Sequence, residues 1–340
     1  MAIVLRKMTR KYRMANIQRL ACSLPTRIKY VILIKKKKQL QQPSKYQVNF
    51  LPFSICQQGE MIMNYDENIN IQDKLQHLDQ LKTIYLQNKK NLLLDTSFVE
   101  KYQENFLVQY TYDSTSIEGN TLTKEETYSL LIDNRTPSNK DILEIYEQIN
   151  HKNAFQYMLS EIKANRELSE SILCNIHKIV TQNILPGGIY RNVLVYIANA
   201  HHDFPQPDEL PLLMKHFYSE LESKINICNL PESNHTPFEL ACWIHAKFVD
   251  LHPFRVGNGR TGRLIMNYQL IRYDYLPLSI PVEDKTAYCN YLDHYSCTGN
   301  LIPFVEYLID LELKELTNMV KIEKSLSNTL ESQEEQKNGI

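Results

Sequence analysis

The sequence predicts an all-α fold, a helical bundle with one β-hairpin flap. Apolar residues recur at helical spacing over most of the chain after Met63, and only residues 189–197 are rich in β-forming side chains. With 340 residues, of which 43% are hydrophobic and 23% charged, the chain can bury a sizeable core. This composition excludes a mostly disordered chain, a collagen-like chain and a disulfide-stapled mini-protein.

The first 62 residues differ in charge from the rest. Residues 1–59 hold 13 Lys or Arg and no acid, which leaves 25 basic against 39 acidic residues in the remainder. A basic arm for nucleic acid or anionic lipid and a transit peptide are two interpretations. However, Gln58-Gly59-Glu60 can be encoded by a purine-rich ribosome-binding sequence. We therefore favour translation from Met63, with residues 1–62 as a disordered or mis-called extension and no role for nucleic acid.

Local signals divide the rest of the chain into helices. Asp95-Thr96-Ser97 is an N-cap, Gly119-Asn120 a helix end, and Thr123-x-x-Glu126 a capping box. The hairpin or extended flap follows Pro186-Gly187-Gly188, and residues 322–340 form a polar tail that is expected to fray. Helices are expected over 66–94, 98–118, from 123, and over 140–164, 169–184, 207–226, 236–251, 258–275, 283–297 and 301–322.

Cysteine usage and hydropathy bear on the compartment. Seven cysteines show no CxxC pair and no regular spacing, so neither a zinc cage nor a disulfide framework is indicated. The aliphatic run 31–34 leads directly into four lysines, and no signal-peptide core is present. We expect a cytoplasmic protein without a membrane span.

The chemistry is concentrated at one helix–turn–helix junction. A helix with an apolar face ends at His252, before Pro253, and a second helix begins near Asn258. Backbone N–H groups at that helix N-terminus, flanked by Gly257 and Gly259, form a cradle for an anion.

Charged side chains complete this motif. Arg260 and Arg263 add bidentate phosphate donors one helical turn apart, and His252 can accept a proton from a hydroxyl. Singly, a histidine before proline, a Gly-x-Gly turn and an arginine pair are usually structural. Together within twelve residues they predict a site that holds a polyphosphate beside an activated nucleophile. The spacing is neither that of a P-loop nor that of a dinucleotide-binding turn.

The run His252-Pro-Phe-x-x-Gly257-Asn258-Gly259-Arg260-x-x-Arg263 resembles the signature of the Fic family. The resemblance covers about residues 110–320. It implies a Fic domain at 110–321, preceded by a helical segment at 63–109, and transfer of AMP from ATP to a Ser, Thr or Tyr hydroxyl of a target protein. It further implies that His252 is the general base, that Gly257, Asn258 and Gly259 hold the α- and β-phosphates, and that both arginines bind the polyphosphate.

The same resemblance assigns roles outside the signature. The flap residues Val195, Tyr196, Ile197 and Ala198 align the target segment by strand addition. Tyr288 falls where the family packs the adenine ring, although a plain core aromatic is the alternative interpretation. Fic proteins often form homodimers, but nothing in the sequence indicates a dimer face.

An upstream segment, Ser114-Thr-Ser-Ile-Glu118-Gly119-Asn120, resembles the inhibitory helix of autoinhibited Fic proteins. By that resemblance Glu118 pairs with Arg263 and occupies the place of the γ-phosphate. ATP then binds poorly or in a non-productive pose.

One position departs from the family pattern. Val256 stands where the family usually places an Asp or Glu that ligates Mg²⁺, and valine offers no lone pair to a hard cation. A protein AMP transferase is the favoured reading, with ATP as substrate and Mg²⁺ binding weakened. The alternatives are an enzyme that removes AMP or transfers another phosphate-containing group, and a non-catalytic nucleotide-binding module.

Overall fold

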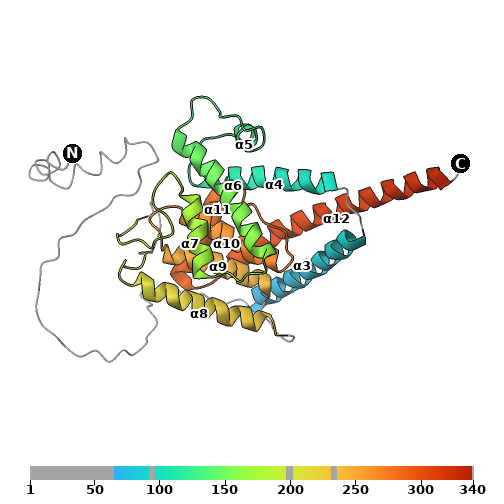
Figure 1. Cartoon of the computed structure of the whole chain (residues 1–340). Coiled ribbons are helices and arrows are strands. Elements are labelled where there is room, and N and C mark those ends of the chain that lie inside the picture. The colour runs from blue at the N-terminus through green and yellow to red at the C-terminus, as the bar shows by residue number, and fades with distance from the viewer. Residues whose placement is uncertain (1–64, 92–95, 197–201, 231–235, 339–340) are drawn as a thin grey trace, which may run out of the picture.

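The computed structural model describes residues 65–91, 96–196, 202–230 and 236–338 (Figure 1). Regular structure within these ranges is entirely helical, as the fold class predicts. The extension at 1–62 and the start at Met63 lie outside the described residues. The α-helices are α3 Tyr65–Asn91, α4 Thr96–Ile117, α5 Lys124–Leu131, α6 Ile142–Lys163, α7 Glu170–Val180, α8 Leu210–Cys228, α9 Pro237–Leu251, α10 Asn258–Arg272, α11 Lys285–Thr298 and α12 Ile302–Asn338, with a short 3₁₀ turn η2 at Val282–Asp284.

Helices α9 and α10 lie in the middle of the helical body, in contact with α6, α7 and α8 (Figure 1). Helix α10 is buried on nearly every face, because apolar residues such as Leu264, Ile265 and Tyr268 surround its axis. Asn267, one of its buried polar side chains, is hydrogen-bonded within the core. The N-terminus of α10 is therefore part of a helix that neighbouring elements surround.

Helices α3 and α12 pack side by side although they are far apart in the sequence (Figure 1). Leu78, Leu308 and Leu316 are fully buried in the cluster that includes this contact, and Lys74 Nζ lies 3.1 Å from Asp310 Oδ1. Helix α12 continues to Asn338, past the helix end predicted at residue 322. Residues 323–338 contain no Gly or Pro and many good helix formers, so no local signal ends the helix earlier.

The predicted β-hairpin is not present among the described residues. Residues 189–196 are irregular, and Ile197 and Ala198 lie outside the described part. The backbone N–H of Arg191 donates to Pro253 O at 2.8 Å, so this segment is bonded to the α9–α10 junction. Tertiary contacts of this kind override β-propensity, which depends strongly on context.

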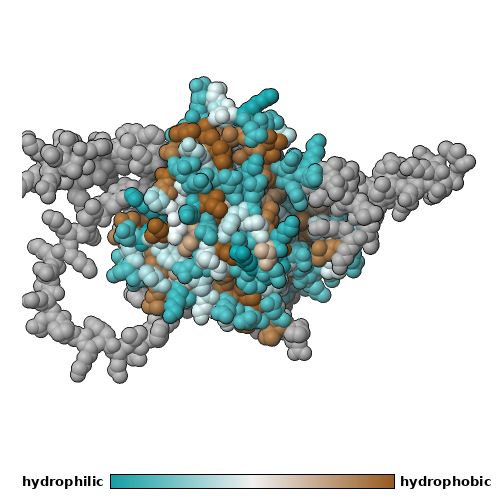
Figure 2. Space-filling view, in the orientation of Figure 1, coloured by the Kyte–Doolittle hydropathy of each residue, from teal (hydrophilic) through white to brown (hydrophobic). Residues whose placement is uncertain are grey.

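The surface is mixed in polarity, with apolar residues gathered over α5 and the start of α6 (Figure 2). Tyr128, Ile142 and Leu143 are the large exposed apolar side chains there. Across the described ranges, none of the helices combines the length and hydropathy needed to cross a membrane.

Candidate active site

The junction of α9 and α10 forms a tight loop, residues 252–260, that we call the anion loop. Helix α9 begins with a capping box between Thr236 and Glu239 and ends at His252, which adopts the left-handed conformation (φ 45°, ψ 56°). Gly257 is also left-handed (φ 79°) and precedes α10. A left-handed non-glycine residue is strained and persists only where its surroundings fix it.

Asn258 closes the anion loop on itself. Its Oδ1 accepts from the Phe254 N–H at 2.9 Å, and its Nδ2 donates to Phe254 O at 2.8 Å. In this structure the side chain of Asn258 bonds the backbone of its own loop, and the phosphate contact that the resemblance implies for it stays a prediction. The first backbone N–H groups of α10 can donate to an anion, because the first N–H groups of a helix have no intrahelical partner.

Arg263 lies at the centre of a buried hydrogen-bond cluster. Its Nη2 donates to Glu118 Oε1 at 3.0 Å and to Ser114 O at 2.7 Å, and its Nε donates to Ser114 Oγ at 2.9 Å. The Arg263 side chain is only 1% exposed, whereas that of Glu118 is 29% exposed. The structure thus brings the upstream segment and the anion loop together across 145 residues of sequence.

The carboxylate of Glu118 lies at the mouth of the anion loop. A Cβ atom on Gly259 would collide with Glu118 Oε1, so the acid lies directly against the start of α10. Burial raises the pKa of Glu118, but the positive charges of Arg263 and then Arg260 outweigh it, and the net pKa is lowered. Glu118 is therefore an anion in the place that the helix N-terminus and two arginines favour. Gly119 follows in the left-handed conformation (φ 100°) and ends the segment.

Arg260 faces a second carboxylate. Its Nη1 lies 3.6 Å from Glu147 Oε1 on α6, and Glu147 Oε2 accepts from Asn120 Nδ2 at 2.8 Å. Within the described residues, the buried Nε and Nη1 atoms of Arg260 have no hydrogen-bond partner. These donors are available to a ligand anion.

His252 carries the only imidazole within the anion loop. It is 4% exposed, and neither ring nitrogen has a side-chain hydrogen-bond partner in the part of the chain that the structure describes. Burial, followed by the charge of Arg191, lowers the pKa of His252 to about 4, although Glu118 opposes this shift. His252 is therefore neutral at pH 7 and has a free lone pair for a proton.

His177 on α7 is a further residue of this region, and the sequence did not reveal it. Its Nδ1 accepts from the Gly188 N–H at 2.8 Å, so its Nε2 carries the proton and donates to Val256 O at 2.9 Å. Its ring stacks on Phe254 with centroids 3.6 Å apart, and burial lowers its pKa to about 4. His177 thus joins the Pro-Gly-Gly segment to the anion loop. A lone histidine on an amphipathic helix gives no sequence signal of such a role.

Tyr288 lies beneath Arg263 in the core. Its hydroxyl accepts from Arg263 Nη1 at 3.3 Å and lies 2.7 Å from His245 Nε2, and the residue is 2% exposed. These contacts agree with the core-aromatic alternative. The adenine role stays a prediction that requires this side chain to be uncovered.

Val256 leaves the anion loop without a metal-binding side chain. Its carbonyl accepts from His177, and the described residues contain no group of three or more His, Cys, Asp or Glu that could hold a metal ion. The residues at this position therefore do not fit a protein-held Mg²⁺.

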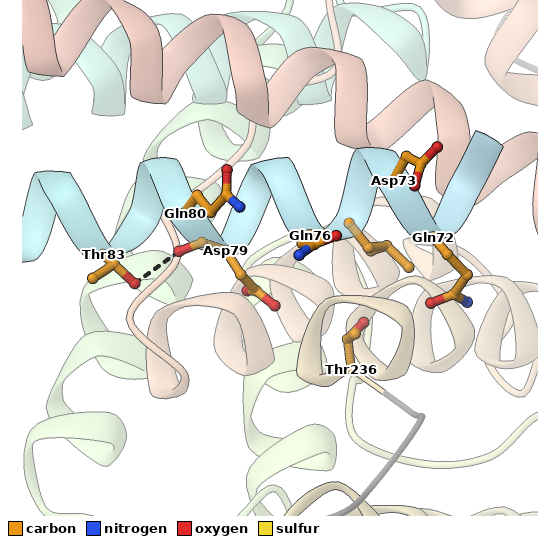
Figure 3. Close-up of a pocket in the computed structure, with 8 residues that line it drawn as sticks. Gln72, Asp73, Gln76, Asp79, Gln80, Thr83 and Thr236 are labelled. Carbon is orange, nitrogen blue, oxygen red and sulfur yellow. Dashed lines mark hydrogen bonds between the residues drawn. The ribbon is translucent and has the colours of Figure 1, made fainter. Parts of the chain in front are cut away.

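A groove along α3 is separate from the anion loop. Its lining includes Gln72, Gln76 and Gln80 of α3 and Thr236 at the start of α9 (Figure 3). It shares no residue with the anion loop, and no histidine, cysteine or basic side chain lines it. The groove is lined mainly by amide and carboxylate side chains, Asp73 and Asp79 among them.

Fold and site together define a helical protein with an anion-binding loop, a neutral histidine at its edge and an acidic residue at its mouth. Residues 167–270, from before α7 to near the end of α10, match the Fic/DOC family. The chain therefore carries a Fic domain.

Relatives and solved structures agree with this assignment. The protein adenylyltransferase Fic of Drosophila persimilis is 30% identical over 277 residues, covering 79% of this chain and 52% of the relative. That of Aedes aegypti is 32% identical over 243 residues, covering 69% and 47%. The chain thus spans about half the length of these curated relatives. A Fic domain containing signaling protein from Bacteroides thetaiotaomicron superposes with a TM-score of 0.61 at 27% identity, covering 72% of this chain and 98% of the other. Fic-1 from C. elegans gives 0.63 at 26% identity, covering 75% and 72%.

Proposed function

We propose that the protein transfers AMP from ATP to the hydroxyl of a Ser, Thr or Tyr side chain of a target protein, and that Glu118 inhibits this transfer. The observation that carries the proposal is the pair formed by Glu118 and Arg263 at the N-terminus of α10, beside a neutral His252 that has no side-chain hydrogen-bond partner among the described residues. The name protein adenylyltransferase, carried by the relatives, supports it.

The reaction balances with the groups present. The target hydroxyl oxygen bonds to the α-phosphorus of ATP, its proton passes to a ring nitrogen of His252, and the bond from the α-phosphorus to the bridging oxygen breaks to release pyrophosphate. Arg260, Arg263 and the backbone N–H groups of α10 stabilise the charge on the phosphates. Glu118 must leave Arg263 before the γ-phosphate can take its place.

The proposal also covers the alignment of the target chain and the cellular compartment of the protein. Val195, Tyr196, Ile197 and Ala198 would align the target chain; Val195 is buried and Tyr196 is exposed. Five free cysteines among the described residues are compatible with a reducing, cytoplasmic setting. A homodimer stays an expectation from the family resemblance.

The test uses ATP labelled at the α-phosphate and three forms of the full chain. We expect label on protein with Glu118→Gly, little with the wild type, and a loss of at least about 100-fold with Glu118→Gly/His252→Ala, since general bases contribute factors of this size. Incorporation of γ-label would indicate kinase-like chemistry, which Gly259 argues against because phosphorylating relatives place Lys there. Absence of α-label in all three forms, also with manganese, would refute the proposal.

Val256 favours a second candidate, an enzyme of altered phosphate chemistry such as AMP removal, or a nucleotide-binding module without catalysis.

In the Glu118→Gly background, we expect Val256→Asp to raise AMP transfer at least about 10-fold at millimolar Mg²⁺, because a carboxylate supplies the missing hard ligand. Titration of activity against Mg²⁺ measures this effect, and Val256→Asn controls for the change in size. If the Glu118→Gly chain depends on Mg²⁺ in the same way with and without Val256→Asp, a carboxylate at position 256 is dispensable for AMP transfer.

A further inference from the structure

Arg191 lies in the segment between α7 and α8, and each of its three guanidinium nitrogens donates a hydrogen bond to a backbone carbonyl. Its Nε donates to His252 O at 2.8 Å, its Nη1 to Val193 O at 3.1 Å and its Nη2 to Pro205 O at 2.8 Å. Its own N–H donates to Pro253 O at 2.8 Å. Arg191 is 4% exposed, so these bonds are shielded from water. Unlike Arg260, this arginine has no nitrogen left without a partner for a phosphate.

The bond to His252 meets a specific structural need. His252 is left-handed at the end of α9, where the last helix carbonyls have no intrahelical N–H donor. Arg191 Nε donates a hydrogen bond to the His252 carbonyl in its place. The imidazole makes no hydrogen bond to another side chain among the described residues, and the backbone of Val249 is the one hydrogen-bonding group that acts on it. Its orientation therefore depends on backbone groups and on the ring of Phe204 packed against it.

The bond to Pro205 secures one of those rings. Phe204, the residue before Pro205, lies against the His252 ring with centroids 4.5 Å apart. The same guanidinium thus holds the His252 backbone and the backbone next to the aromatic ring that contacts His252.

We propose that Arg191 is the positioning residue of His252, holding the imidazole in the orientation in which it accepts the proton of the target hydroxyl. The inference rests on the proposed function for the identity of the reaction. It adds a residue 61 positions away from the histidine that it positions.

The charge of Arg191 gives a second, measurable consequence. Burial lowers the pKa of His252 most; among the neighbouring groups Arg191 and His202 lower it, and Glu118 and a backbone hydrogen bond to Val249 raise it. Removal of the Arg191 charge therefore raises the pKa of His252, whereas loss of the fork geometry alone does not. Lysine keeps the charge but cannot bridge three carbonyls, and glutamine loses the charge.

The experiment compares Arg191→Lys and Arg191→Gln in the full-length Glu118→Gly chain, with Arg135→Gln at an exposed site as the charge control. NMR of labelled histidine rings gives the pKa of His252, with His252→Ala used for assignment. AMP transfer gives kcat and KM for ATP. We expect kcat to fall at least about 10-fold in both variants with KM changed by less than about 2-fold, because positioning of a general base acts on the chemical step. We expect the pKa of His252 to rise in Arg191→Gln only.

The readouts separate this inference from the proposed function. If the Glu118→Gly chain transfers no AMP, the proposed function fails, while the NMR titration still decides whether Arg191 acts on His252. Should Arg191→Gln fold poorly, Arg191→Lys tests the effect on kcat by itself. A kcat equal to that of the parent in Arg191→Lys, or a His252 titration in Arg191→Gln identical to that of the parent, would overturn the proposal.

Discussion

Replacement of Glu118 by glycine is expected to tighten ATP binding by about 10- to 100-fold. Glu118 forms a charge-assisted hydrogen bond to Arg263 at 3.0 Å and lies against Gly259, so it competes with a phosphate for charge and for space. A hydrogen bond to a charged group contributes about 1.5–3 kcal/mol, and each 1.4 kcal/mol is tenfold in affinity. Calorimetry with a non-hydrolysable ATP analogue measures the effect, in a His252→Ala background that prevents turnover.

Two further variants separate charge from space at this position. Glu118→Gln keeps the size of the side chain but removes its charge, so we expect it to recover only part of the gain seen with glycine. Glu125→Gln removes an exposed acid of α5 and should leave ATP binding unchanged. Equal affinities in wild type, Glu118→Gly and Glu118→Gln would contradict an inhibitory role for this carboxylate.

Local signals explain why most of the fold was predictable. The capping box at Thr236 and the His252-Pro253 pair give α9 bounds of 237–251, one residue from the predicted 236–251. Helix α12 ran past its predicted end because its apolar pattern weakens before its helix propensity does. No strand is present among the described residues of the predicted hairpin or extended flap, where Arg191 bonds its segment to the anion loop, a contact that no local pattern reveals.

The candidate site likewise combines residues that local sequence patterns predict with residues that only tertiary contacts bring together. The anion loop is contiguous in the sequence, and the motif around Glu118 is compact, so both were visible without a structure. The His177 ring bonds a backbone amide 11 residues away and a backbone carbonyl 79 residues away. The Arg191 side chain bonds a backbone carbonyl 61 residues away. Backbone groups are present at every position, so such contacts leave no residue pattern to read.

Replacement of Glu312 by glutamine is expected to stabilise the protein at pH 7 by about 2–3 kcal/mol. Glu312 on α12 is fully buried; its Oε1 accepts from the Leu276 N–H at 2.8 Å, while its Oε2 has no hydrogen-bond partner within the described ranges. Burial raises the pKa of Glu312 from 4.5 to about 8, against smaller opposing effects of the Leu276 N–H and Lys82. The folded protein therefore keeps this carboxyl protonated at pH 7, whereas the unfolded chain ionises it.

The sign of the pH dependence follows from these two states. Between about pH 4.5 and pH 8 the unfolded chain gains stability by ionising Glu312, so the free energy of unfolding falls by up to about 1.4 kcal/mol per pH unit. Glutamine keeps an acceptor for the Leu276 N–H and cannot ionise, so this contribution disappears. Urea unfolding at pH 5, 6 and 7 should show curves for wild type and Glu312→Gln that diverge as pH rises. Glu306→Gln, on the same helix and partly exposed, is the control and should follow the wild type. Parallel pH dependence of wild type and Glu312→Gln would show that Glu312 is already ionised in the folded protein.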